Sequence, residues 1–224
     1  MRPLRDNGLS LLFGALFLVT LAGQSIAGYF EYSERMQEHG QAAETFGAFV
    51  LSSDFVVDVA ENWQSEFLQF FLFIAATIWL VQRGSPESKK PGDEGAGSDE
   101  EQMVGEHARE DSPSWARARG FRQVVFSNSL LLVMGTVFVL SWLAQSLAGT
   151  VVMNSENAQH GQPQITWPEY LATPDFWSRT LQNWQSEFLA VGAMIALSIY
   201  LRQRGSSESK PVGLPHHTTS VESD

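Results

Sequence analysis

Two identical stretches, Asn-Trp-Gln-Ser-Glu-Phe-Leu at residues 62–68 and 183–189, carry the side chains with the clearest chemical potential. On a helix, the asparagine, serine and glutamate of each stretch fall at i, i+3 and i+4 and share one face. Such a face can bind a cation, a proton or a small polar solute. It can equally hydrogen-bond one membrane helix to another and fix their register. The sequence leaves both interpretations open.

Two glutamines are expected at the same depth as the two glutamates. Counted along the apolar segments, each glutamate lies about four residues, or about 6 Å, inside the outer membrane boundary. An unpaired carboxylate in hydrocarbon costs several kcal/mol, so we expect this layer to face the interior of a helix bundle. The predicted polar layer consists of Glu66, Glu187, Asn62, Asn183, Gln24 and Gln145.

Other kinds of site have little support. A metal site would need His39 and His160 to fold back from loops onto the glutamates, and these histidines lack helical ligand spacing. The chain has no cysteine, which excludes thiolate ligands and disulfides. No phosphate loop, dinucleotide fingerprint or hydrolase elbow is present. We therefore expect no metal, no cofactor and no enzymatic activity.

The apolar residues indicate four membrane helices. They form four blocks, at residues 9–28, 67–81, 129–149 and 188–201. A helix of about 20 residues crosses a bilayer about 30 Å thick, and the first and third blocks have that length. The other two reach it when extended outward through the heptapeptides, which predicts helices from about Asp54 to Val81 and from about Pro174 to Leu201.

The chain is a tandem duplication. Placing residue n over residue n+121 needs no gap from Asn7 to Lys89, and 33 of these 83 positions are identical. Residues 1–30 have features of a cleaved signal peptide, but the equivalent internal segment cannot be a leader, so we predict that both are retained helices. The predicted fold is an all-α integral membrane protein with four transmembrane helices. They form two repeats of two helices, related by a parallel pseudo-two-fold axis.

Local signals predict further helix ends. The outward loops, 31–61 and 152–182, are each expected to hold a short helix, because Thr166 to Glu169 has capping-box spacing. Thr173 followed by Pro174 predicts the start of the last helix. At the inner ends, Gln-Arg-Gly-Ser-x-Glu-Ser-Lys occurs twice, and arginine followed by glycine predicts a helix stop. The alternative is contact of these cations with anionic lipid or a partner.

Charge predicts the orientation of the chain. The net charge of −11 argues against nucleic-acid partners. Of the 14 Lys and Arg, 12 precede the first block, separate the second from the third, or follow the fourth, so both termini and the linker are predicted to be cytoplasmic. The predicted domains are a first membrane repeat at 1–90, a disordered acidic linker at 91–122, a second membrane repeat at 123–211 and a disordered tail at 212–224.

The heptapeptide and Gln-Arg-Gly-Ser-x-Glu-Ser-Lys motifs, with the preceding Gln-Ser and His-Gly-Gln pairs, resemble an uncharacterised family of bacterial membrane proteins described as a domain of unknown function. The resemblance implies a location in the bacterial cytoplasmic membrane and carries no known activity. We expect a multi-pass membrane protein with a structural or interaction role. Its partners would be the lipid bilayer and another copy or another membrane protein. The alternative is a small ion, proton or polar-solute channel or transporter subunit that uses Glu66 and Glu187.

Overall fold

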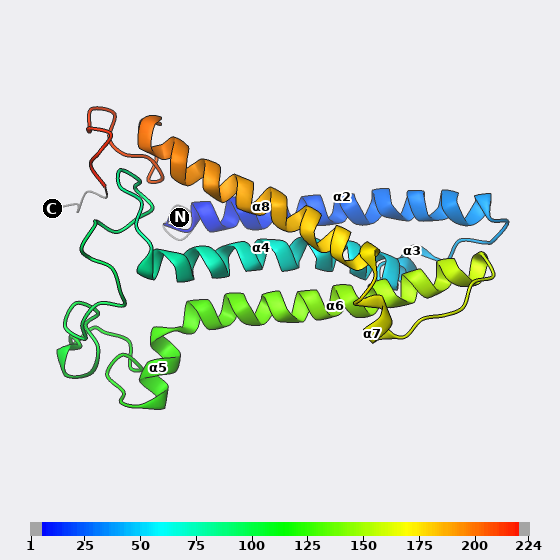
Figure 1. Ribbon diagram of the computed structural model, residues 1–224, viewed down its shortest axis with the longest axis horizontal. Helices are drawn as coiled ribbons and strands as arrows, with labels where there is room; N and C mark the ends of the chain where they lie inside the picture. The colour runs from blue at the N-terminus through cyan, green and yellow to red at the C-terminus, as the bar shows by residue number, and fades with distance from the viewer. Residues whose placement is uncertain (1–5, 220–224) are drawn as a thin grey trace. The chain divides into compact units, whose positions relative to one another are not determined.

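A computed structural model describes residues 6–219, and all regular secondary structure in that range is helical, with no strand (Figure 1). The α-helices are α2 (Gly8–Glu38), α3 (Phe46–Phe49), α4 (Ser53–Trp79), α5 (Phe121–Ser127), α6 (Ser129–Gln159), α7 (Trp167–Tyr170) and α8 (Pro174–Tyr200). The linker adds one 3-10 turn, η1 (Gly105–His107). The predicted all-α class is confirmed. Residues 1–5 of the predicted first repeat and 220–224 of the predicted tail lie outside the described range.

Helices α2 and α6 are long and apolar enough to cross a membrane, and they are the two helices in residues 6–219 that meet both criteria. Each has 31 residues, or about 46 Å at about 1.5 Å per residue. This length exceeds the roughly 30 Å of hydrocarbon in a bilayer. The finding favours a membrane protein.

Both long helices extend into the segments that were predicted to be loops. Residues 31–38 and 152–159, expected in the loops, form the last turns of α2 and α6. Each helix stops at a His-Gly-Gln triplet, where Gly40 and Gly161 adopt φ of 68° and 65°. The left-handed conformation is easy for glycine and lets the following amide turn back onto the helix. Gln41 N donates to Met36 O at 2.8 Å, and Gln162 N donates to Asn157 O at 2.7 Å.

The helices of the two halves have matching bounds. Each of α6, α7 and α8 begins and ends 121 residues after α2, α3 and α4 respectively. The short helix expected in each loop is present as α3 or α7. The Thr173 hydroxyl accepts a hydrogen bond from Phe176 N at 3.3 Å, as expected of an N-cap.

The inner ends differ from the prediction. Helices α4 and α8 end at Trp79 and Tyr200, before the two arginine–glycine pairs, so neither arginine lies in a last helical turn. The Gln-Arg-Gly-Ser-x-Glu-Ser-Lys motif instead forms a separate loop. In this loop, serine hydroxyls accept hydrogen bonds from backbone amides that have no helical carbonyl as a partner.

The chain divides into two compact units. Unit 1 comprises Met1–Ala60 and Ala144–Leu171, and unit 2 comprises Glu61–Leu143 and Ala172–Asp224.

In unit 1, each short helix packs an aromatic ring against a glycine of a long helix. Phe49 and Tyr170 are 2% and 1% exposed. A Cβ added to Gly28 would lie 3.2 Å from the Phe49 ring, and one added to Gly149 would lie 2.8 Å from Tyr170 Cζ. The two glycines are 121 residues apart, as are the two aromatic residues, so the same contact forms twice. At Gly149, where the distance is under 3.0 Å, only glycine allows such a close approach.

In unit 2, aromatic side chains of α6 and α8 form the core. The Trp142 ring lies 5.7 Å from Phe138, 5.9 Å from Phe176 and 5.9 Å from Trp184. Trp142 Nε1 also donates to the buried Thr180 hydroxyl at 3.4 Å. Helix α5 precedes α6 at a sharp angle (Figure 1). The aromatic core around Trp142 includes Trp184 and so holds the second heptapeptide in place.

Candidate functional site

The six residues of the predicted polar layer are divided between the two units. Gln24 and Gln145 belong to unit 1; Asn62, Asn183, Glu66 and Glu187 belong to unit 2. Within unit 2, the carboxylates of Glu66 and Glu187 are close enough for their charges to interact. Glu66 and Asn62 are exposed, whereas Glu187 and Asn183 are half-buried.

The buried face of α4 differs from the predicted one. Gln64, Ser65 and Leu68 are 0%, 2% and 7% exposed. Asn62 and Glu66, expected to point inward, lie outside that buried face. Spacing along one helix shows which residues share a face, but neighbouring helices decide which face is covered.

Two side-chain contacts connect α4 to α8, and one of them joins the two heptapeptides. Trp184 Nε1 donates to Gln64 Oε1 at 2.7 Å, and Gln64 Nε2 donates to Glu61 O at 3.0 Å. In the N-terminal half of α4, the Glu61 carboxylate lies 3.2 Å from Arg179 Nη1 of α8. Gln64 and Trp184 are therefore interaction residues that the sequence prediction missed. The signal was present in the sequence, because the glutamine and the tryptophan recur in both heptapeptides.

Three other polar residues of the heptapeptides, Asn183, Ser65 and Ser186, bond to their own helices. Asn183 Nδ2 donates to Arg179 O at 3.0 Å. The hydroxyls of Ser65 and Ser186 donate to the carbonyls three residues earlier, at 2.9 and 2.8 Å. Such local bonds compete with longer-range ones. These side chains are thus occupied within the helix.

Gln145 is fully buried in α6, and neither atom of its amide has a hydrogen-bond partner among the described residues. Its repeat equivalent, Gln24, is exposed. A buried amide without a partner costs about 1–3 kcal/mol. Gln145 is therefore the most costly member of the predicted layer.

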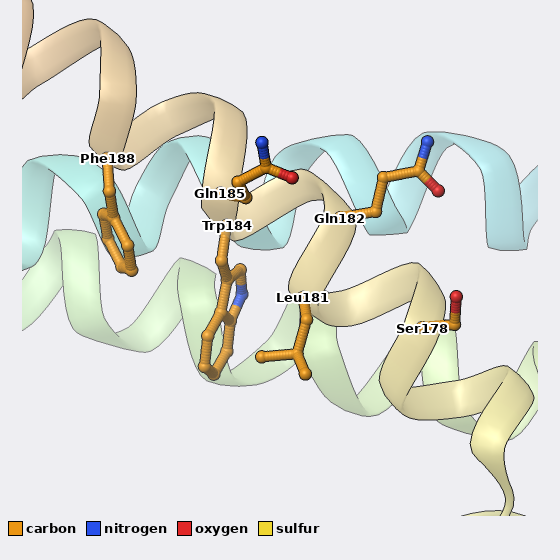
Figure 2. A pocket seen from close by; sticks show the side chains of 6 residues that line it. All are labelled: Ser178, Leu181, Gln182, Trp184, Gln185 and Phe188. Carbon is orange, nitrogen blue, oxygen red and sulfur yellow. The ribbon is translucent and has the colours of Figure 1, made fainter.

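A groove runs along the outward face of α8 (Figure 2). The amides of Gln182 and Gln185 point to one side of the helix, and Trp184 and Phe188 point to the other. The groove thus presents hydrogen-bonding groups beside apolar surface.

The two copies of Gln-Arg-Gly-Ser-x-Glu-Ser-Lys, at 82–89 and 203–210, form the same loop. Gln82 N donates to Ser88 Oγ at 2.7 Å, and Gln203 N donates to Ser209 Oγ at 2.8 Å. A second serine in each copy accepts from the glutamate amide, at 3.2 and 3.1 Å. The glycines, Gly84 and Gly205, have φ of 87° and 84°. Glycine gives the turn and serine satisfies the backbone, which explains these residue types.

Glu87 and Glu208, at equivalent positions of the two loops, are close enough for their charges to interact. Burial and then the charge of Glu208 raise the pKa of Glu87. The repeated motif therefore brings two acidic side chains together.

Lys210 anchors the end of the chain to the first loop. It is 3% exposed, and its Nζ donates to the carbonyls of Gly84, His216 at 2.9 Å and Thr218 at 3.1 Å. Burial and then the charge of Arg202 lower the pKa of Lys210. The Thr219 hydroxyl accepts from Gly84 N at 3.0 Å. Residues 216–219 thus lie against the loop of the first repeat.

His39, one of the two loop histidines, lies at the end of its helix. His39 caps the C-terminus of α2, and its Nδ1 lies 2.7 Å from Arg35 O. Over residues 6–219, no group of three or more histidine or acidic side chains is arranged to hold a metal ion.

Residues 1–221 match the family described as Domain of unknown function (DUF6766). No curated protein and no solved structure matches the chain.

Proposed function

The chain belongs to this family of unknown function, and from that premise we propose that it is a non-enzymatic, multi-pass membrane protein with a structural or interaction role. The observation that carries the proposal is the contact between the heptapeptides. Gln64, a fully buried polar side chain that bridges α4 and α8, uses both its amide nitrogen and its amide oxygen within the chain. This contact supports a role of the motif in pairing helices.

The exposed apolar surface supports the membrane location. Only 6% of the most apolar stretch of α2, and 17% of that of α6, is buried. Water would make such exposure unfavourable, whereas a bilayer requires it. We propose four membrane helices, α2, α4, α6 and α8, in two parallel repeats. Their matching bounds, 121 residues apart, support this arrangement.

The proposed location is a bacterial cytoplasmic membrane, with both termini on the cytoplasmic side. Reporter fusions after Gly95 and after Gly161 test this topology. A cytoplasmic signal at Gly95 and an extracytoplasmic signal at Gly161 are expected. The reverse pattern, or release of the protein from membranes by alkaline carbonate, contradicts the proposal.

A channel or transporter subunit for an ion, a proton or a polar solute is the second candidate. It is favoured by the electrostatic interaction of Glu66 with Glu187 in unit 2, because paired carboxylates attract cations. The two functions are separated by Glu66→Gln combined with Glu187→Gln, reconstituted in liposomes. A folded variant that has lost the parent's ion or proton flux supports the channel. Absence of flux in both proteins supports the structural role.

A further inference from the structure

A cavity of about 400 Å³ lies at the C-terminal end of α4, within unit 2. Phe73 and Ala76 of α4 and Ile195 of α8 line it, and most of its wall is apolar. Among the described residues of the lining, Glu87 is the one that carries a charge. Sites for small organic ligands have about 300–1,000 Å³ and combine apolar walls with a few polar groups. The cavity has this size and this composition.

Glu87 has no basic residue as an ion-pair partner in residues 6–219. The charge that acts on it is that of a second carboxylate, Glu208. The lysines of the two motif copies, Lys89 and Lys210, donate to backbone carbonyls instead. Two carboxylates that repel one another beside an apolar wall are stabilised when a positive charge joins them. This end of the cavity therefore favours a cation from outside the chain.

The second repeat differs at two of the positions that line this cavity. Ala76 and Val81 correspond to Leu197 and Arg202, 121 residues later. Leucine and arginine are the larger residues of each pair, and the Arg202 guanidinium donates to Ile199 O at 3.0 Å. The second repeat thus has its own cation at the end of its helix. The first repeat has smaller side chains and no charge at these two positions.

We propose that the cavity binds a small organic cation, a protonated or quaternary amine with an apolar body. Its nitrogen lies at Glu87, and its apolar groups lie against Phe73 and Ile195. Phe73 adds an aromatic ring, which attracts such cations. A metal ion fits less well, because it needs several oxygen ligands, whereas the walls are mostly apolar and residues 6–219 hold no metal-binding group of three acidic or histidine side chains. This ligand site is additional to the proposed structural role and does not depend on it.

Benzyltrimethylammonium is a probe of this chemistry, and isothermal titration calorimetry of the full chain in non-ionic detergent measures its binding. Benzenesulfonate, an anion of similar size, is the comparison. We expect the cation to bind saturably at a single site and the anion not to bind. Glu87→Gln removes the charge with little change in shape and should weaken binding of the cation by about tenfold or more. Glu100→Gln, at an exposed linker position, is the matched control and should bind like the parent.

Two further variants take their side chains from the second repeat. Ala76→Leu fills the cavity and Val81→Arg places a charge of the chain beside it, so each should abolish binding of the probe while far-UV circular dichroism stays unchanged. Val81→Arg keeps Glu87 intact and therefore tests the charge even when Glu87→Gln fails to fold. The inference is overturned by absence of saturable binding to the parent, or by equal binding to folded Glu87→Gln or Ala76→Leu. Unfolding that depends on Glu87 and pH, without binding of the cation, would show that this carboxyl takes up a proton only and would overturn it as well.

Discussion

Gly28 and Gly149 occupy equivalent positions, but the aromatic rings over them differ by one hydroxyl group. A Cβ at Gly149 meets Tyr170 Cζ at 2.8 Å, and the nearly fully buried ring has little room to move. We expect Gly149→Ala to destabilise the protein by about 1–3 kcal/mol through overpacking. Gly28→Ala should be close to neutral, because the gain in helix propensity of about 1 kcal/mol offsets a small shift of Phe49. Thermal unfolding in detergent compares the two, and equal losses would contradict the proposed difference in packing.

Gln145 offers a second test at the level of one side chain. Gln145→Met keeps the volume and removes an amide without partners. The variant should therefore be more stable than the parent by about 1–3 kcal/mol. A lower unfolding temperature would contradict this, and would mean that the amide binds a solute or an ion, as the channel alternative requires.

At the scale of helices, the bond that joins α4 to α8 through the heptapeptides can be tested by substitution. Trp184→Phe removes the donor to Gln64 and should cost about 1–3 kcal/mol, because the buried Gln64 Oε1 loses its partner. Trp63→Phe, at the equivalent and more exposed position, should cost less. A double-mutant cycle with Gln64→Leu isolates the interaction, and a coupling near zero would exclude the helix-pairing role.

The sequence predicted the helix starts better than the helix faces. Thr173 and Pro174 specify the start of α8 through contacts within one turn, so their effect can be predicted locally. Burial of Gln64 instead of Glu66 depends on helices far away in the sequence. Because the two heptapeptides are identical, the repeat predicted that both would be buried to the same extent. This prediction is wrong, because α4 and α8 have different neighbours. The serine-bonded inner loops were also missed, because an arginine–glycine pair has the same local pattern as a helix stop.

The loops that carry Glu87 and Glu208 should respond to pH. The raised pKa of Glu87 means that the folded protein holds this proton more tightly than the unfolded chain. The stabilisation that protonated Glu87 contributes to the folded protein is complete below the ordinary glutamate pKa. It is lost as pH rises through the raised pKa of Glu87. Glu87→Gln should weaken this dependence in unfolding temperatures measured from acidic to neutral pH. Glu100→Gln, at an exposed linker position, is the control and should behave like the parent.

At the scale of the whole molecule, residues far apart in sequence complete one loop. Ending the chain after Pro211 removes the Thr219 hydroxyl from Gly84 and two carbonyls from Lys210. Each lost hydrogen bond is worth about 1 kcal/mol, so the first loop should open more often. We expect faster trypsin cleavage at Arg83 and unchanged cleavage at Arg109. Equal rates at Arg83 would show that the tail does not hold the loop.

The same attachment has a consequence for synthesis on the ribosome. The contact between Gly28 and Phe49 can form as soon as the first loop has been made. The loop at Gly84, by contrast, depends on residues that are translated 126 and 135 positions later. The first repeat therefore acquires the packing of Phe49 on Gly28 early and the contacts of the loop at Gly84 last, after the second repeat has been made. A chain that stalls in translation would leave this loop open, and proteases would distinguish it from a finished protein.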